Sequence, residues 1–312
     1  MAELGLTGRS FLTLHDYSPT ELAALLDLAA ELKAKQKAGE AHAVLAGRVL
    51  AMVFQKTSTR TRVSFEVGMY QLGGHALFLS SNDIQLKLGE TIKDTANVLS
   101  RYCDGIMIRT FAQQDVVDLA RFGQVPVING LTDDYHPCQV MADLLTIREH
   151  LGELAGRHLV FVGDGENNMA NTLMEGGVMM GMDVTICGPA GYQPRADFVA
   201  AARAAAVGGA TITISDDPQA AVGGADVIYA DTWTSMGQEA EHDRRVSDLA
   251  GFQIDDALMA VAGPQARVMH CLPAHWGEEI TESVLYSPQS IVFDQAENRL
   301  HAQKAIMAAV IR

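Results

Sequence analysis

The stretch RVLAMVFQKTSTRTRVSF, residues 48–65, indicates the fold class of this chain. After one arginine, residues 49–54 are apolar, as in a strand that helices cover on both faces. The polar residues 56–62 follow, and Val63, Val67 and Tyr70 then recur at helical spacing. A buried strand that leads through a polar turn into a helix predicts one unit of a parallel α/β sheet.

The same alternation of short apolar runs and helical segments continues along the chain. The expected strands are residues 48–54, 75–79, 105–108, 125–128, 158–162, 183–187, 211–214, 226–229 and 267–270. A last apolar helix is expected at 302–311. The pattern predicts an α/β fold of two doubly wound parallel-sheet domains, and the C-terminal helix is able to dock back on the first domain.

A first helix is expected to begin after Ser18. Ser18 and Glu21 form a capping box, and Pro19 stands at the first helical position. Lys33, Lys35 and Lys37 close the last turns, where cations suit the helix dipole. We interpret these lysines as a solvated helix end.

Length and charge restrict the class of protein. A chain of 312 residues exceeds the size at which one core usually keeps growing, so two domains are expected. We place them at residues 1–147 with about 295–312, and at 148–294. The formal net charge of −15 argues against a surface for nucleic acid, which requires clustered Lys and Arg.

The cysteines and the apolar segments indicate the compartment. Four cysteines lie far apart without a C-x-x-C pair, so neither a disulfide framework nor a structural zinc site is expected. The N-terminus lacks an apolar run of signal-peptide length. No segment approaches 18 consecutive apolar residues, which argues against a membrane span. We therefore expect a cytoplasmic protein with no membrane contact.

Polar clusters follow the ends of the expected strands. In open α/β sheets, ligands bind beyond the carboxyl ends of the strands, so these clusters are the candidate functional site. They are residues 56–62, Arg109, His136-Pro137-Cys138-Gln139, residues 163–168, Asp231, Ser235-Met236-Gly237 and His270-Cys271-Leu272-Pro273.

The segment Ser58-Thr59-Arg60-Thr61 stands where a helix is expected to start. Unsatisfied N–H groups and the helix dipole would favour an anion there, and Arg60 can bind phosphate oxygens with two N–H groups. A simple Ser or Thr N-cap with surface arginines fits the same residues equally well. No G-x-x-x-x-G-K-[ST] motif occurs, so a P-loop nucleotide hydrolase is not supported.

Three other patterns are weaker. Gly163-Asp164-Gly165 resembles part of a dinucleotide fingerprint, but Asn168 stands where the third glycine is needed. His136 and Cys271 fit either a Cys–His pair or two unrelated residues. The histidines, including His275, have no i, i+4 partner of metal-ligand type, so no metal site is expected.

Four motifs together resemble the aspartate and ornithine carbamoyltransferase family. FQKTSTRTR (54–62) resembles the family's phosphate-binding segment, and HPCQ (136–139) with Asp143 resembles its second signature. DTWTSMGQE (231–239) and HCLPAH (270–275) are similar to motifs of the ornithine branch. The motifs occur in the family's order and cover essentially the whole chain.

The resemblance implies a carbamoyl-phosphate domain followed by an ornithine domain. The implied reaction transfers the carbamoyl group of carbamoyl phosphate to the δ-amine of L-ornithine, giving L-citrulline and phosphate in arginine metabolism. It implies no metal and no organic cofactor. It also implies a homotrimer, or a multiple of trimers, with active sites shared between subunits.

The resemblance also assigns the site residues. The residues implied for carbamoyl phosphate are Ser58, Thr59, Arg60, Thr61, Gln85, Arg109, His136, Pro137, Cys138, Gln139, Cys271, Leu272 and Arg299, with Gln85 from the neighbouring subunit. Those implied for ornithine are Asn168, Asp231, Ser235 and Met236, although Asn167 is an alternative to Asn168. Arg109, His136 and Cys271 would be catalytic, with Cys271 as an orienting or proton-accepting group rather than a covalent nucleophile.

Two other classes of function remain open. One is a nucleotide-dependent oxidoreductase, which the missing third glycine opposes. The other is a non-enzymatic binding protein of two α/β lobes. Within the family, aspartate, putrescine and acetylornithine are rival second substrates, and Ser235-Met236-Gly237 favours ornithine.

Overall fold

The computed structural model describes residues 4–81, 84 and 89–311. The chain forms two compact units, described here one at a time: unit 1 comprises Met1–Leu145 and Glu297–Arg312, and unit 2 comprises Thr146–Ala296. The sequence predicted boundaries at 147/148 and about 294/295.

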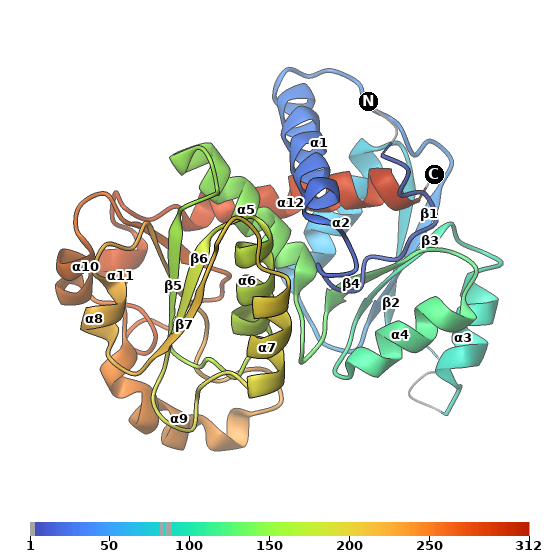
Figure 1. Ribbon diagram of the computed structural model, residues 1–312. Coiled ribbons are helices and arrows are strands. Elements are labelled where there is room, and N and C mark those ends of the chain that lie inside the picture. Colours follow the sequence, from blue (N-terminus) through green and yellow to red (C-terminus); the bar gives the residue numbers. More distant parts are fainter. Residues whose placement is uncertain (1–3, 82–83, 85–88, 312) are drawn as a thin grey trace. The chain divides into compact units, whose positions relative to one another are not determined.

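Unit 1 contains a parallel sheet between two helical layers (Figure 1). Its elements are α1 (Pro19–Lys37), β1 (Val49–Phe54), α2 (Thr59–Gln71), β2 (His75–Ser80), α3 (Ile92–Leu99), β3 (Gly105–Arg109), α4 (Gln113–Phe122), β4 (Val127–Leu131), most of α5 (Pro137–Leu151) and the greater part of α12 (Val292–Val310). On one face, Ala96 of α3 and Leu119 of α4 pack against Val53 and Ile108 of the sheet. On the other face, Gly105 lets the side chain of Ile311 approach β3 closely.

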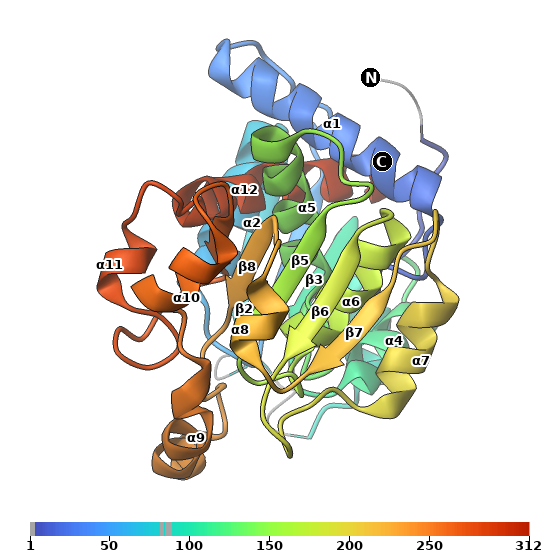
Figure 2. The ribbon, with the colours of Figure 1, turned by 60° about the vertical axis from the view of Figure 1, so that its left-hand side comes forward.

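Unit 2 repeats this layered arrangement (Figure 2). Its elements include β5 (His158–Val162), α6 (Asn168–Met179), β6 (Asp183–Cys187), α7 (Ala196–Ala204), β7 (Ile212–Ser215), α8 (Pro218–Val222), β8 (Val227–Ala230), α9 (His242–Leu249), α10 (Asp256–Ala262), β9 (Arg267–His270) and α11 (Glu282–Leu285). Leu258 of α10 and Leu285 of α11 pack with Val160 and Val268 of the sheet. Helices α6 and α7 lie on the opposite face (Figure 2).

The strand order determines where each unit can bind a ligand. In unit 1 the order is β2-β1-β3-β4, and Phe54 of β1 lies opposite Arg109 of β3. In unit 2 the order is β7-β6-β5-β8-β9, and Phe161 of β5 lies opposite Tyr229 of β8. In each unit the chain first passes from the opening strand (β1 or β5) to one side of it and later crosses back to the other side. Such a reversal of the crossover direction opens a crevice at the carboxyl ends of the strands. The residues that follow β1, β3, β5 and β8 are therefore placed for ligand binding.

Every strand expected from the sequence is present among the described residues, which confirms the predicted fold class. The bounds of β4 differ most from the predicted 125–128, since the strand spans Val127–Leu131. It begins after Pro126, which has no N–H to donate to a strand ladder.

Helix α2 forms where it was expected, but the apolar residues that indicated it do not lie on its buried face. Val63, Val67 and Tyr70 are 49%, 37% and 80% exposed. The buried face instead contains small residues, because α12 approaches closely: a Cβ at Gly68 would lie 3.0 Å from Cε of Met307. The apolar spacing in the sequence therefore marked the outer face of the helix.

Helix α12 begins at Val292, close to the start near 295 predicted for the C-terminal segment of the first domain and ten residues before the apolar run at 302. Buried polar residues interrupt the apolar pattern in its first half. One of them, Asn298, accepts a hydrogen bond of 2.8 Å from Nζ of Lys33. The interpretation of Lys33 as a solvated lysine was therefore wrong.

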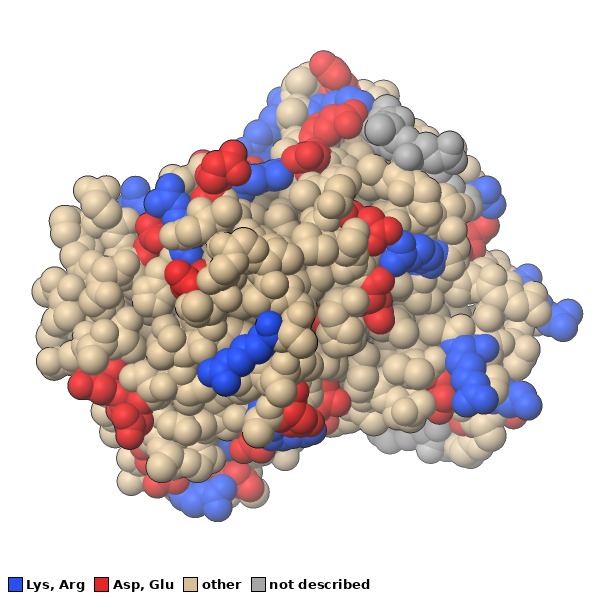
Figure 3. All heavy atoms as spheres, viewed as in Figure 1, with Lys and Arg blue, Asp and Glu red and all other residues tan. Residues whose placement is uncertain are grey.

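Charged side chains are dispersed over the face shown in Figure 3, singly or in small groups with uncharged surface between them. This face therefore offers no continuous basic surface for nucleic acid. Within the part of the chain that the structure describes, no helix combines the length and the apolar character needed to cross a membrane.

Lys304 of α12 carries an unusual buried amine. Its Nζ lies 2.7 Å from Nε2 of His42 and donates a 2.9 Å hydrogen bond to Oε1 of Gln71. Nδ1 of His42 lies 2.7 Å from the carbonyl oxygen of Glu40, so the proton of the ring is on Nδ1 and Nε2 accepts. Burial lowers the pKa of Lys304 from 10.5 to about 8.

This shift makes stability depend on pH. Between pH 8 and 10.5 the folded chain has lost the Lys304 proton and the unfolded chain retains it, so unfolding takes up a proton. The free energy of unfolding of the unmodified chain should therefore rise with pH across this interval, relative to Lys304→Met. Denaturant titrations of both proteins from about pH 7 to about pH 10.5 measure the difference. A difference that does not change with pH would contradict the buried-amine account.

Candidate active site

The loop between β1 and α2 forms the first part of the site in unit 1. Oγ of Ser58 caps α2: it accepts a 3.2 Å hydrogen bond from the N–H of Thr61 and lies 3.1 Å from Oγ1 of Thr61. The N–H groups of the first helical turn have no acceptor within the helix and carry the positive end of its dipole. Lys56, in the same loop, is already paired with Asp133. The loop therefore offers an anion the helix N-terminus, with Arg60 in its first turn.

Three arginines from separate elements lie near His136. Arg60 is in α2, Arg109 ends β3 and Arg299 is in α12, and the last two are buried. Burial above all, and then the charges of Arg299, Arg109 and Arg60, hold the pKa of His136 well below its ordinary range. The imidazole is therefore neutral at pH 7, and the region carries an excess of positive charge.

Arg299 is held by residues of two other helices. Its Nη1 donates a 2.7 Å hydrogen bond to Oε1 of Gln139 in α5, and its Nη2 donates a 3.3 Å bond to Oγ1 of Thr61 in α2. The amide nitrogen of Gln139 donates in turn to Asp143 at 2.9 Å. This chain of contacts brings Thr61, Gln139 and Arg299 together, although 238 residues separate Thr61 from Arg299 along the sequence.

Pro137 begins α5, and the thiol of the next residue points into the core. Cys138 donates a 3.3 Å hydrogen bond from Sγ to the carbonyl oxygen of Asn129 in β4. Burial raises the pKa of this thiol to about 12, so it remains neutral. The side chain of Cys138 therefore serves packing against β4.

In unit 2, Asp231 and Cys271 meet at the ends of β8 and β9. Ala230 pairs with His270 in the sheet, so the next residues of the two strands are neighbours. Sγ of Cys271 donates a 2.9 Å hydrogen bond to Oδ1 of Asp231, which also accepts a 2.7 Å bond from the N–H of Thr232. The structure therefore joins two of the predicted site residues directly.

The turn after β9 has an uncommon backbone. Leu272 has a φ of 59°, which residues with side chains rarely adopt, and the bond to Pro273 is cis. The N–H of Leu272 donates to Nδ1 of His270 at 2.8 Å, and Nε2 of His270 lies 3.1 Å from Oε1 of Glu279. Both ring nitrogens of His270 are thus engaged, and the Leu272 N–H is already used inside the protein.

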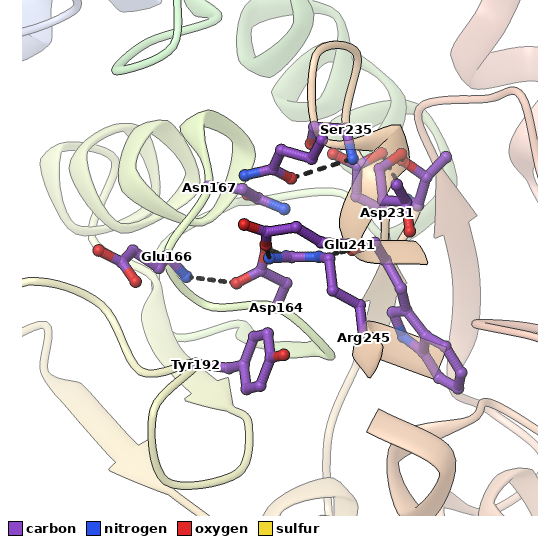
Figure 4. A network of polar contacts seen from close by, with 12 residues as sticks. Asp164, Glu166, Asn167, Tyr192, Asp231, Ser235, Glu241 and Arg245 are labelled. Carbon is purple, nitrogen blue, oxygen red and sulfur yellow. Dashed lines mark hydrogen bonds and ion pairs between the residues drawn. The ribbon is translucent and has the colours of Figure 1, made fainter. Parts of the chain in front are cut away.

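A buried ion pair holds the loop between β5 and α6 (Figure 4). One oxygen of Asp164 accepts a 3.0 Å hydrogen bond from the N–H of Glu166, and the other pairs with Arg245 of α9. Arg245 also donates to the carbonyl oxygen of Trp233 and lies 5.0 Å from the centre of the Tyr192 ring. Burial raises the pKa of Asp164, and the charge of Arg245 opposes that shift. The pair ties this loop to the segment that carries Ser235 and Met236.

The remaining predicted ornithine residues lie on these two segments. Asn167 caps α6 by accepting a 2.8 Å hydrogen bond from the N–H of Ala170, and Asn168 is the first helical residue. The N–H of Ser235 donates to Gln238 at 3.2 Å, and Met236 is exposed. Which asparagine faces ornithine stays a prediction.

The structure does not describe one of the predicted site residues, and it adds two residues that the sequence did not indicate. Gln85 lies outside the described residues. Sequence reasoning missed Arg245, whose partner Asp164 is 81 residues away along the chain. It also missed Glu279, which contacts the nearby His270 and His275. Neither residue belongs to a local motif with a ligand-binding signature. When a charged residue stands among other charged residues in the sequence, a single sequence does not indicate that its side chain is buried.

The comparisons with known proteins concern nearly the whole chain. Residues 9–149 match the family description "Aspartate/ornithine carbamoyltransferase, carbamoyl-P binding domain", and residues 155–310 match "Aspartate/ornithine carbamoyltransferase, Asp/Orn binding domain". The ornithine carbamoyltransferase of Pelobacter propionicus is 56% identical over 303 residues, which are 97% of this chain and 98% of the relative. That of Anoxybacillus flavithermus is 54% identical over 311 residues, 99% of each chain.

Solved structures give the same result. The ornithine carbamoyltransferase from Pyrococcus furiosus superposes with a TM-score of 0.95 at 52% identity and covers 98% of both chains. The one from Gloeobacter violaceus has a TM-score of 0.87 at 46% identity and covers 98% of this chain and 99% of its own. The chain therefore belongs to the aspartate/ornithine carbamoyltransferase family, and within it to the ornithine carbamoyltransferases.

Proposed function

We propose that the chain transfers the carbamoyl group of carbamoyl phosphate to the δ-amine of L-ornithine, giving L-citrulline and phosphate. The observation that carries this proposal is the group of three arginines around the neutral His136, one of which, Arg60, lies in the first turn of α2. A chain of net charge −15 that buries positive charge at one point is suited to bind a small, highly charged anion there. The names of the relatives and the motifs around Asp231 and Cys271 support ornithine as the second substrate.

Unit 1 would bind carbamoyl phosphate. The phosphate oxygens would accept from the first N–H groups of α2 near Ser58 and Thr59, and from Arg60 and Arg299. Attack on the carbamoyl carbon places negative charge on its oxygen. Arg109, the hydroxyl of Thr61 and the neutral imidazole of His136 would stabilise that charge by donating hydrogen bonds to it. Catalysis would therefore consist mainly of positioning and electrostatics.

Unit 2 would supply the groups that recognise ornithine. Asp231 suits the α-ammonium group, and Asn168, Ser235 and Met236 would complete the contacts to the amino acid. Cys271 would lie near the δ-amine. Because its thiol is hydrogen-bonded to Asp231, the sulfur is held in a fixed orientation and can accept a proton as it passes its own to the carboxylate.

The backbone of the turn after β9 would serve the carbamoyl group. The family resemblance implies that the backbone of Cys271 and Leu272 meets the carbamoyl NH₂, which donates hydrogen bonds and therefore needs carbonyl oxygens as partners. The resemblance implies neither a metal nor an organic cofactor for this step. We further propose a role in arginine metabolism in the cytoplasm; the described cysteines form no disulfide, which suits a reducing compartment.

We also propose that the chain assembles as a homotrimer, or a multiple of trimers, in which Gln85 serves the site of the next subunit. Support comes from the outer face of α2, where Val63, Val67 and Tyr70 form an exposed apolar stripe at positions i, i+4 and i+7. A contiguous apolar stripe on a helix is typical of a surface that a neighbouring subunit covers.

The phosphate assignment is tested with Arg60→Ala. Loss of a charge-assisted hydrogen bond to the reacting anion is worth roughly 2–4 kcal/mol in the transition state. Citrulline formation should therefore fall by about a hundredfold or more, with the fold intact. The matched control is Arg62→Ala, because Arg62 is two residues further on and is paired with Glu66 at 3.1 Å. Near-normal turnover of a folded Arg60→Ala protein would remove this loop from the site.

The form of ornithine that reacts is tested by pH. A δ-amine with a pKa near that of lysine, about 10.4, is mostly protonated at neutral pH, and only the neutral form attacks. Activity at subsaturating ornithine should therefore rise from about pH 6.5 to about pH 8.5. His136 does not produce this rise, because its pKa lies well below the ordinary value of 6.5. A flat profile, with product release shown not to limit the rate, would contradict attack by the neutral amine.

The sharing of sites between subunits is tested with two impaired variants, Arg60→Ala and Gln85→Ala. If Gln85 serves the next subunit, every mixed trimer contains one site with an intact Arg60 and an intact neighbouring Gln85. Dissociating and reassociating the two variants together should then restore up to about one third of the unmodified activity per mixed trimer.

The control for this experiment is each variant reassociated alone, with mixed trimers confirmed by native mass spectrometry. Activity that equals the sum of the two parents, despite confirmed mixing, would show that each site belongs to one chain.

A further inference from the structure

A group of potential metal ligands lies on the segment that follows the Cys271–Pro273 turn. His275, Glu278 and Glu279 each offer one ligand atom, and these atoms lie within 4.8 Å of one another. The backbone holds them together: the N–H of Glu278 donates to the carbonyl oxygen of His275 at 3.0 Å, and Gly277 has a φ of 91°. A tight turn therefore brings the imidazole and the two carboxylates to one side.

Glu279 is the unusual member of this group because it is fully buried. Its Oε1 accepts from the backbone N–H of His275 and lies 3.1 Å from Nε2 of His270. Its Oε2 is buried and has no hydrogen-bond partner among the described residues. A buried carboxylate oxygen without a partner is costly, and a bound cation would offset that cost.

The unpartnered oxygen faces the other ligands. Oε2 of Glu279 lies 3.8 Å from Nδ1 of His275, which is too long for a hydrogen bond. Two ligand atoms on one tetrahedral Zn²⁺, each about 2.0–2.1 Å from the ion, lie roughly 3.3 Å apart. A small rotation of the half-exposed His275 would therefore bring both atoms within reach of one ion.

His242 of α9 lies beside the group and contacts one of its members, Glu278. Nε2 of His242, the first residue of α9, lies 3.1 Å from Oε1 of Glu278. The side chains of His242 and His275 are 46% and 48% exposed, so an ion can reach the group from solvent. Two imidazoles and two carboxylates are a donor set for a transition-metal dication of the zinc type, whereas Mg²⁺ and Ca²⁺ prefer oxygen alone.

We propose that His275, Glu279, Glu278 and His242 form a binding site for a zinc-type dication, distinct from the residues assigned to the two substrates. His270 lies next to the site and not in it, because one ring nitrogen accepts from Leu272 and the other is bonded to Glu279. It holds the ligand Glu279 in place, as the neighbours of metal ligands commonly do. From the sequence, no i, i+4 partner of metal-ligand type was assigned to His275, but Glu279 stands at that position and is such a partner.

The test measures metal binding to the untagged full-length chain. Cys271→Ser serves as the parent protein, because Cys271 is the partly exposed cysteine and its thiol is a rival zinc ligand. Calorimetric titration with Zn²⁺ should show about one ion per chain, and Co²⁺ should give the visible absorption of a four-coordinate ion without a thiolate charge-transfer band. Adding His275→Ala or the isosteric Glu278→Gln should weaken Zn²⁺ binding by at least about tenfold.

The matched control is His150→Ala in the same parent, since His150 is likewise paired with one carboxylate, Asp294 at 2.9 Å, outside the group. It should leave the affinity for Zn²⁺ unchanged. No Zn²⁺ binding to the parent protein, or binding that neither His275→Ala nor Glu278→Gln weakens, would overturn the proposal. Because citrulline formation is not the readout, either result leaves the proposed carbamoyl transfer untouched.

Discussion

The burial of positive charge around His136 constrains the rest of unit 1. Arg109 and Arg299 are both buried, and like charges in a low-dielectric interior repel one another unless acceptors or an anion compensate them. The protein supplies part of that compensation, because Gln139 and Thr61 accept from Arg299. A bound phosphate would supply the rest. The return of α12 to unit 1 places Arg299 in this group.

The strand order of the two sheets explains why the candidate site residues of each unit lie at strand ends. In both sheets the crossovers reverse direction once, beside β1 in unit 1 and beside β5 in unit 2. Helix N-termini and loop residues converge at such a reversal. In unit 1, cationic side chains gather at this reversal around a helix N-terminus. In unit 2, Asp231 and Cys271 are hydrogen-bonded there, and the buried Asp164–Arg245 pair holds the β5–α6 loop.

The sequence alone predicted the parts of the fold that depend on apolar runs. Parallel strands such as 158–162 are buried on both faces, so each reads as a continuous apolar segment that ends at a polar turn. Prediction from the sequence failed where polar side chains are buried. Lys33 is hydrogen-bonded to Asn298, which is 265 positions away, and no local pattern indicates such a pair. For the same reason it missed Arg245. The roles of residues such as Asp231 came from the family motifs and not from spacing.

The most direct test of the account is a single assay of carbamoyl transfer. The unmodified chain is given carbamoyl phosphate with ornithine, aspartate, putrescine or acetylornithine in turn, and the carbamoylated product and phosphate are measured. The account predicts L-citrulline and phosphate in equal amounts from ornithine, with much slower transfer to the other three. No citrulline from ornithine, or faster transfer to any of the rival amines, would contradict it.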